Sequence, residues 1–334
     1  MIPVSIVTGF LGSGKTTLIG RVLRDPAFAR TAVIVNEFGE IGLDHELIAS
    51  SDETLMALTT GCLCCAVQGD LSRTLLNLRA TQANAYDRVL IETSGLADPA
   101  PILHALMTDR ALAQDHAIDT IATVVDSLLG ADTLAAHPEA RRQVALADVL
   151  ILSKLDLADP APALLDGLAA INPAAERHQA ATIAPAALFG GGEGAARATQ
   201  LTDRLTRLPD QPVASPFSVA RHTDGIESFS LVRERPIPAL ALTLLLQALA
   251  EHCGPRLLRM KGIIAIEEAP ERPAVVHGVQ HVFAPPEFLS AWPEGPRLSR
   301  LVFITRGVPR YFPARLLDMI EAEVREEMQS ASGP

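Results

Sequence analysis

One short motif restricts the fold of this chain more than any other feature. Gly9-Phe-Leu-Gly-Ser-Gly-Lys-Thr16 matches the pattern G-x-x-x-x-G-K-[ST]. The apolar run Ile2–Val7 precedes the motif and the helical pattern Thr16–Leu23 follows it. A strand, a glycine-rich turn and a helix in this order form a loop whose backbone amides converge on phosphate groups. The motif therefore predicts a nucleotide-phosphate site at the end of a buried strand.

The residue types in this loop suggest a role for each position. The glycines let the backbone approach the phosphates closely, and the helix N-terminus adds positive potential. We expect Lys15 to reach the β- and γ-phosphates, and the Thr16 hydroxyl to bind Mg²⁺. The predicted nucleotide contacts in the loop are Gly9, Gly12, Ser13, Gly14, Lys15, Thr16 and Thr17.

Apolar runs and helical patterns alternate through the first half of the chain. Buried strands that alternate with helices predict an α/β fold, with a mainly parallel sheet flanked by helices. The expected strands are Ile2–Val7, Thr31–Val35, Arg88–Ile91, Thr120–Val125 and Val149–Leu152, with helices at Gly69–Leu78 and Arg141–Ala147.

The second half has a different order of elements. The glycine cluster Gly190–Gly194 and three prolines that follow it indicate a linker. Strands that cluster in sequence indicate a smaller α+β domain. We predict a P-loop domain over residues 1–190, a linker over 191–215 and an α+β domain over 216–328. The expected strands there are Phe217–Val219, Phe229–Arg233, Leu258–Glu267, Ala274–Phe283 and Arg300–Thr305, with helices at Ala239–His252 and Pro313–Met328.

Composition and charge argue against several classes of partner. Of the 334 residues, 48% are apolar and 20% charged, which is enough apolar material for packed domains. Acidic residues outnumber basic ones by 39 to 28, the wrong sign for a nucleic-acid partner. No apolar run reaches the roughly 18 residues of a membrane span, and Met1–Thr8 is typical of a strand rather than a signal sequence. We expect a cytoplasmic protein with neither nucleic-acid nor membrane partners.

Two later strands end in residues suited to a nucleotide site. The third expected strand ends at Glu92, and Gly95 follows it. We expect Glu92 to lie beside Mg²⁺ and the Gly95 amide to sense the γ-phosphate. The fifth ends in Ser153-Lys154-Leu-Asp156. The Asp156 carboxylate can accept both hydrogen bonds of the guanine N1 and N2 edge, and Lys154 can lie over the base. Ser153 stands where the usual guanine motif has Asn.

Three of the four cysteines lie together in Gly61-Cys62-Leu-Cys64-Cys65. Adjacent cysteines in a cytosolic chain favour metal or redox chemistry over a disulfide, and thiolates bind Zn²⁺, Cu⁺ or iron–sulfur clusters. A tetrahedral zinc site would take two or three of these thiolates and a fourth ligand from elsewhere. The cysteines could instead be small buried apolar residues. Candidates for the fourth ligand lie in the segment after the second expected strand, whose glycines are typical of a loop that responds to the γ-phosphate: Glu37, Glu40, Asp44 and His45.

The remaining cysteine and five histidines outside that segment show no metal-binding pattern. Cys253 stands alone at a helix end, and we interpret it as structural. His277 and His281 are four residues apart, but the run around them is strand-like, and four strand residues span about 13 Å. His104, His116 and His137 occupy polar helical or loop positions, and we expect them on the surface.

These motifs in this order resemble the CobW-like family of P-loop GTPases, zinc metallochaperones related to the nickel-insertion GTPases. The resemblance covers nearly the whole chain, and C-x-C-C beside a P-loop is its most specific element. The segments that carry it are Gly9–Thr17, Asn36–Gly39, Gly61–Cys65, Glu92–Gly95 and Ser153–Asp156, with Leu258–Gly262 and Val276–Gln280 in the C-terminal domain.

The resemblance implies slow GTP hydrolysis with Mg²⁺, binding of Zn²⁺ or another divalent transition metal at the cysteines, and delivery of that metal to a client protein. It leaves a homodimer open. We assign catalytic roles to Lys15, Thr16, Glu92 and Glu37, with Glu37 also joining Cys62, Cys64 and Cys65 at the zinc site. Ser153 in place of Asn and the lack of a histidine-rich stretch are departures from the family's pattern.

Two other functions account for part of the sequence. A small-molecule kinase or ATP-dependent ligase would use the same phosphate loop, but it leaves the cysteine cluster unexplained. A thiol redox sensor would use the cysteines, but it leaves the phosphate loop unexplained.

Overall fold

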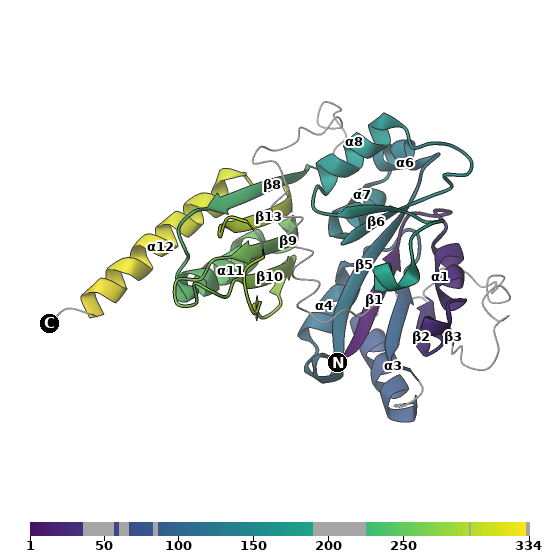
Figure 1. The fold of residues 1–334 in the computed structure, drawn as a ribbon, viewed down its shortest axis with the longest axis horizontal. Coiled ribbons are helices and arrows are strands. Elements are labelled where there is room, and N and C mark those ends of the chain that lie inside the picture. Colours follow the sequence, from purple (N-terminus) through teal and green to yellow (C-terminus); the bar gives the residue numbers. More distant parts are fainter. Residues whose placement is uncertain (36–56, 60–66, 83–85, 190–224, 294, 332–334) are drawn as a thin grey trace. The chain divides into compact units, whose positions relative to one another are not determined.

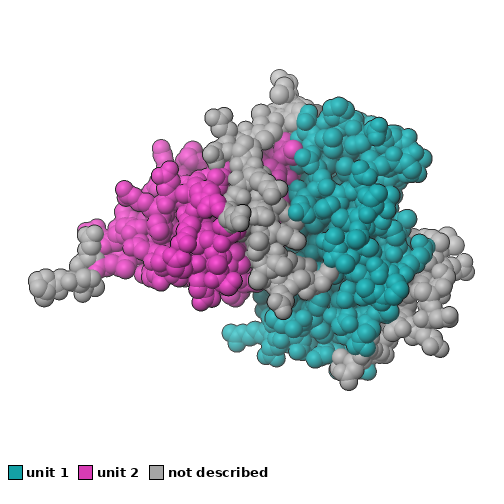
Figure 2. Space-filling model, viewed as in Figure 1, with its two compact units in different colours: residues 1–168, 175–191 teal, residues 169–174, 192–334 magenta. Residues whose placement is uncertain are grey.

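The computed structural model describes residues 1–35, 57–59, 67–82, 86–189, 225–293 and 295–331 (Figure 1). The chain divides into two units: residues 1–168 with 175–191, and residues 169–174 with 192–334 (Figure 2). The predicted boundaries near residues 190 and 215 fall outside the described ranges and stay predictions. Among the described helices, none is long and apolar enough to cross a bilayer.

The described part of the first unit contains a seven-stranded sheet in which every pair of neighbours is parallel. Its order is β3-β2-β4-β1-β5-β6-β7. The five apolar runs expected to be strands are confirmed. The strands are β1 (Ile2–Thr8), β2 (Thr31–Val35), β3 (Ala57–Thr59), β4 (Arg88–Glu92), β5 (His116–Asp126), β6 (Val149–Ser153) and β7 (Glu176–Gln179).

Helices flank this sheet. Leu18, Ile19 and Val22 of α1 pack with Val7 of β1 and Leu90 of β4, because apolar residues three and four apart share one helix face. Helices α4 and α7 contact β5, and α3 packs on α4 (Figure 1). The helices are α1 (Lys15–Leu23), α3 (Val67–Gln82), α4 (Ala100–Thr108), α5 (Arg110–Asp115), α6 (Gly130–Ala136), α7 (Pro138–Leu146), α8 (Pro162–Ile171) and α9 (Pro185–Phe189), with the short 3₁₀ helix η1 (Pro26–Phe28).

The register of this sheet aligns the carboxyl ends of four strands. Thr59 of β3 pairs with Val35 of β2, and Val35 pairs with Glu92 of β4. Glu92 also pairs with Val7 of β1, two residues before Gly9. In a parallel sheet the loops that follow these residues start from one edge, where ligands bind in folds of this type.

The second unit contains an antiparallel sheet of order β11-β10-β9-β13-β8, with β12 paired to β10. Leu242, Leu245 and Leu249 of α11 and Leu317 of α12 pack with Phe303 of β13 on one face of this sheet. The elements are β8 (Ile226–Arg233), α11 (Ala239–Cys253), η3 (Gly254–Arg256), β9 (Leu257–Ile264), β10 (Ala274–Val279), β11 (Val282–Phe283), β12 (Glu287–Phe288), β13 (Ser299–Arg306) and α12 (Tyr311–Ala331). An α/β P-loop domain followed by an α+β domain is confirmed.

One expected strand is wrong and another cannot be compared. The run Ala274–Phe283 is a hairpin rather than one strand, because Val279 pairs with Val282 across a two-residue turn. Gln280 adopts φ 54° there, and His281 is the second residue of the turn. The strand expected at Phe217–Val219 lies outside the described residues. Cys253 is buried at the end of α11, as its structural interpretation requires.

Candidate functional site

The phosphate loop links β1 to α1 through glycines in conformations that other residues avoid. Gly9, Gly12 and Gly14 have φ values of 143°, 70° and 98°. A Cβ atom on Gly9 would lie 2.3 Å from the carbonyl oxygen of Val124 in β5, so no side chain fits at this position. The loop is therefore packed against β5 with its backbone as the contact surface.

Lys15 is the first residue of α1 and is only 9% exposed. Its ammonium donates hydrogen bonds to the carbonyl oxygens of Gly9, at 3.0 Å, and Phe10, at 3.3 Å. The nearby Ser13 hydroxyl is buried and has no hydrogen-bond partner among the described residues. A cation and the N-terminus of a helix thus converge on one turn, which is the chemistry that a polyphosphate requires.

Thr16 and Glu92 meet at the edge of the sheet. The Thr16 hydroxyl donates to the Glu92 carboxylate, with 2.7 Å between Oγ1 and Oε1, and Glu92 is 2% exposed. A hydroxyl oxygen and a carboxylate oxygen are ligands that Mg²⁺ prefers. The pair fits Mg²⁺ bound beside a nucleotide.

Gly95 lies in a turn between β4 and α4 in which the Ala97 amide donates to the Ser94 carbonyl at 3.0 Å. A Cβ atom on Gly95 would lie 2.6 Å from the backbone nitrogen of Leu11, so the turn packs directly on the phosphate loop. This contact brings the predicted γ-phosphate sensor to the phosphate loop.

The segment after β6 is tied to both the phosphate loop and β5. The Ser153 hydroxyl donates to the Ser13 carbonyl at 2.6 Å, and its oxygen lies 3.3 Å from the Val125 carbonyl oxygen. Lys154 adopts a left-handed backbone conformation, with φ 58°, and its ammonium lies 2.6 Å from the Asp126 carboxylate. Asp156 is exposed at this edge of the sheet. At the position where the usual motif has Asn, Ser153 therefore links β6 to the phosphate loop and to β5.

Asp126 ends β5 and was not singled out from the sequence. Burial raises the pKa of its carboxyl, but hydrogen bonds from Lys154 and from the amides of Leu129 and Leu128 outweigh burial and hold the pKa below its ordinary value. The ionised carboxylate thereby fixes the lysine that we expect over the base.

Gln143 of α7 was also missed. It is 0% exposed, and its side-chain nitrogen donates to the carbonyl oxygens of Gly95 and Ala97, each at 3.0 Å. A glutamine inside an amphipathic helix carries no motif, so no sequence signal could have found it.

The expectation that His104 and His116 lie on the surface is wrong, because both are buried. His104 faces inward on α4, and His116 begins β5 beside Ile2 of β1. His137 is half-buried, and its ring stacks on Phe10 of the phosphate loop with 4.3 Å between centroids. None of these positions could be told from residue polarity, since packing of distant segments covers them.

The predicted zinc ligands cannot be placed. Glu37, Cys62, Cys64 and Cys65 lie outside the described residues, as do Glu40, Asp44 and His45. Within the described ranges, no group of three or more His, Cys, Asp or Glu side chains is positioned to hold a metal ion. The zinc site therefore stays a prediction.

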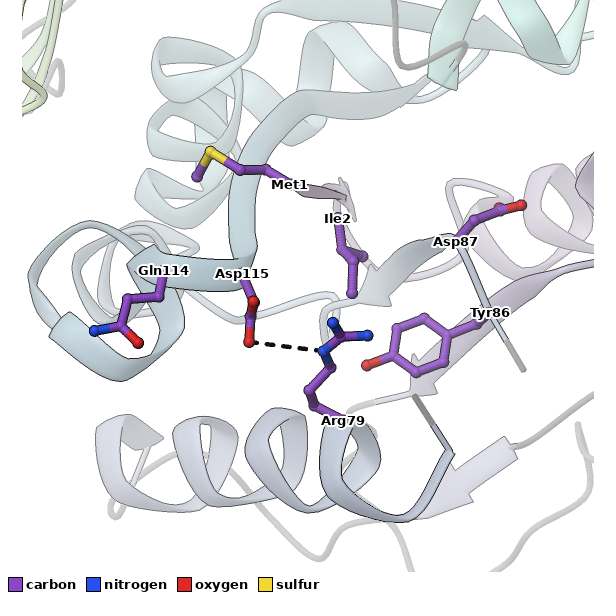
Figure 3. A pocket seen from close by; sticks show the side chains of 7 residues that line it. All are labelled: Met1, Ile2, Arg79, Tyr86, Asp87, Gln114 and Asp115. Carbon is purple, nitrogen blue, oxygen red and sulfur yellow. Dashed lines mark ion pairs between the residues drawn. The ribbon is translucent and has the colours of Figure 1, made fainter. Parts of the chain in front are cut away.

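A cavity of about 310 Å³ opens at the opposite edge of the sheet (Figure 3). It is lined by Arg79 and Asp115, which form an ion pair at 3.6 Å, and by Tyr86. Its lining includes Ile2, the first residue of β1, and Asp87 and Asp115, which directly precede β4 and β5, so it lies at the amino ends of these strands. This cavity is thus separate from the site at the carboxyl ends, where the phosphate loop lies.

The strand, loop and helix with their paired threonine and glutamate define a P-loop nucleotide-binding domain. Residues 3–180 match the family model described as "CobW/HypB/UreG, nucleotide-binding domain", and residues 226–322 match "Cobalamin synthesis protein cobW C-terminal domain". The chain belongs to the CobW-like family of P-loop GTPases, which confirms the resemblance inferred from its motifs.

Individual relatives agree with this assignment. The chain is 30% identical over 315 residues to "Zinc chaperone YjiA" of Escherichia coli (strain K12), covering 92% of this chain and 95% of that protein. It is 40% identical over 189 residues to "Zinc chaperone CobW" of Pseudomonas aeruginosa, covering 47% and 50%. A crystal structure of a Zn(II)-bound triple mutant of the YjiA GTPase is similar with a TM-score of 0.70 at 25% identity, covering 96% of this chain and 99% of that one.

Proposed function

We propose that this chain is a GTP-hydrolysing metallochaperone. It binds Zn²⁺, or a similar divalent metal, at Cys62, Cys64 and Cys65 with Glu37, and it passes the metal to a client protein under control of the bound nucleotide. Relatives named zinc chaperones and a similar structure named as a Zn(II)-bound GTPase support zinc as the metal. Family membership favours this function over a kinase, a ligase or a redox sensor.

The observation that carries the proposal is the register across β3, β2 and β4. Glu92 accepts the Thr16 hydrogen bond at the phosphate loop and pairs with Val35, which in turn pairs with Thr59. In the sequence, Glu37 follows Val35 by two residues and Cys62 follows Thr59 by three. The carboxylate that faces the phosphate loop is therefore one strand away from Val35 and two from Thr59, the strand ends after which both predicted metal-binding segments follow in the sequence.

In this proposal the residues of the loop bind and orient GTP. Lys15 and the amides at the start of α1 counter the charge of the β- and γ-phosphates, and Gly95 senses the γ-phosphate. Asp156, which follows the anchored residues Ser153 and Lys154, accepts the guanine hydrogen bonds. Thr16 and Glu92 would hold Mg²⁺, which when bound neutralises the charge that develops on the phosphates.

The decisive experiment is a pair of zinc titrations under anaerobic, reducing conditions, one with a non-hydrolysable GTP analogue and one with GDP. We expect zinc affinities that differ by roughly 5- to 150-fold, the range of ordinary coupling between sites. Cys64→Ala should abolish the difference, whereas Cys253→Ala, which removes a cysteine of the second unit, should leave it unchanged.

Two superimposable titration curves would show that the metal site and the nucleotide are not coupled, and the metallochaperone proposal would then lose its mechanism. A second control follows from thermodynamic reciprocity: zinc must change the ratio of the affinities for the GTP analogue and for GDP by the same factor.

A further inference from the structure

Gln143 is anchored on one side and holds a turn on the other. Its backbone carbonyl accepts a hydrogen bond from the Thr123 hydroxyl of β5 at 2.8 Å. Its side-chain nitrogen donates to the carbonyls of Gly95 and Ala97, each at 3.0 Å. Since Thr123 pairs with Thr8, the residue just before the phosphate loop, the glutamine is fixed to the strands that carry that loop.

The turn that Gln143 holds is fixed from two sides. Gly95 packs on the Leu11 backbone, where even a Cβ atom would lie 2.6 Å from its nitrogen. Gln143 binds the carbonyls at the other end. In a trans peptide the C=O and the following N–H point in opposite directions, so the bond to the Gly95 carbonyl directs the Leu96 amide away from Gln143. One side-chain amide thereby sets the orientation of the Leu96 amide, the backbone donor that follows Gly95 in this turn.

Helix α7 contacts the phosphate loop as well. His137, at its N-terminal cap, stacks on Phe10 with 4.3 Å between ring centroids. Arg141 donates to the carbonyls of Leu134 and Ala135 and so ties the end of α6 to α7. The helix that carries Gln143 is thus connected both to the phosphate loop and to the turn that meets the γ-phosphate in the proposed function.

We propose that Gln143 is a positioning residue for the nucleotide reaction. It holds the Gly95 turn in register with the phosphate loop, so that the site distinguishes a nucleotide with a γ-phosphate from one without. This inference rests on the proposed function. It predicts that loss of the Gln143 side chain weakens the response to the γ-phosphate and leaves GDP binding intact. The reason is that the hydrogen bonds described for the Lys15 ammonium and the Ser153 hydroxyl go to other residues.

The test compares Gln143→Met with Gln247→Met, a matched exposed glutamine of α11 whose side chain bonds only to Glu251 among the hydrogen bonds described. The other side-chain atom of Gln143, Oε1, has no partner among the described residues, so methionine removes just the two donated bonds. For Gln143→Met we expect GDP affinity within about twofold of the parent, with the affinity for a GTP analogue and kcat each lower by tenfold or more. Gln247→Met should change none of these.

A second variant, Gln143→Glu, keeps the size of the side chain and changes its hydrogen bonding. Its ionised carboxylate donates no hydrogen bond, whereas its protonated form donates one, and burial raises the pKa of such a carboxyl. The analogue affinity of this variant should therefore recover as the pH falls from 8.5 to 5.5, relative to the parent protein. A role confined to stability would not give this pH profile.

A further readout needs no variant. Hydrogen exchange of the amides of residues 94–97 in the parent protein should be slower with the GTP analogue than with GDP. Equal exchange in the two states, an equal loss of GDP and analogue affinity in Gln143→Met, or parent-like behaviour of that variant would each overturn the inference. A parent protein that binds both nucleotides but hydrolyses no GTP would instead contradict the proposed function.

Discussion

His116 shows how much a single side chain depends on the packing around it. The ring is only 2% exposed at the start of β5, beside Ile2 of β1. Burial lowers the pKa of His116 below its ordinary value, more than the Leu112 carbonyl and the Asp115 carboxylate raise it, and Arg79 lowers it further. The histidine is therefore neutral in the folded chain near neutral pH.

This burial predicts the direction of a pH effect on stability. The unfolded chain binds a proton at His116 near pH 6.5, whereas the folded chain binds it only at lower pH. The stability that the neutral ring contributes is complete above the unfolded-state pKa of about 6.5. It falls as the pH drops below that value, by at most about 1.4 kcal/mol per pH unit for one proton. In His116→Phe, the unfolding midpoint should fall less between pH 7.5 and 5.5 than in the parent chain.

Urea or thermal unfolding at the two pH values measures this difference. The exposed histidine at the end of α11 gives the control, because His252→Gln should leave the pH dependence as in the parent chain. The same pH dependence in His116→Phe and the parent would show that His116 does not take up a proton on unfolding.

At the residue scale, the sequence predicted what has a chemical pattern and missed what packing alone creates. Lys15, Thr16 and Glu92 were found because the phosphate loop and a strand-end carboxylate follow a known spacing, and the structure brings them together. Gln143 and Asp126 follow no such spacing. Their positions depend on the packing of α7 and β5 against the site.

At the scale of elements, the strands with buried apolar runs were predicted, whereas an edge strand and a hairpin turn were not. The strand β7 has the sequence Glu-Arg-His-Gln and lies at the edge of the sheet, so no apolar run marks it. The turn between β10 and β11 was missed because Gln280-His281 contains none of the Gly, Asn or Asp residues that usually occupy two-residue hairpins.

The same turn predicts a stabilising substitution. Gln280 has φ 54°, a left-handed conformation that costs a non-glycine residue about 1–2 kcal/mol. Gln280→Gly should relieve this cost, less the greater entropy of glycine in the unfolded chain, for a net gain of about 0.5–1 kcal/mol. Thermal unfolding measures it, with Gln247→Gly inside α11 expected to lose about 1 kcal/mol. A lower midpoint for Gln280→Gly would show that the turn depends on the glutamine side chain.

At the scale of the whole molecule, the order of the two folds was predicted, but one feature of their connection was not. Residues 169–174, near the end of α8, belong to the second unit. Ala174 packs with Ile263, Val275 and Val302, and the Ala170 carbonyl accepts a hydrogen bond from Ser228 at 2.8 Å. No local sequence pattern reveals that residues 169–174 pack in the second unit, because this packing depends on residues far away in the sequence.

The packing of residues 169–174 in the second unit predicts how a truncated chain should behave. We expect residues 1–191 to keep GTP affinity within about threefold of the parent, because the residues around the phosphate loop lie in the first unit. The truncated protein should unfold at a lower temperature, since Ala170 and Ala174 lose their partners. Calorimetry and nucleotide titration together test this expectation. A folded truncation without GTP affinity would show that the second unit contributes to the nucleotide site.

The burial of the lysines has a consequence for chemical labelling. The chain has three lysines, and its other basic side chains are arginines. Lys261 is buried in β9, Lys15 is buried in the phosphate loop, and Lys154 is half-buried against Asp126. An amine-acylating reagent therefore finds few reactive side chains on the folded protein, and two of the three lysines lie at the site proposed for the nucleotide. In the proposed function the nucleotide shields Lys15 and Lys154, so the extent of acylation at these two positions is expected to be an intrinsic footprint of nucleotide occupancy that needs no engineered probe.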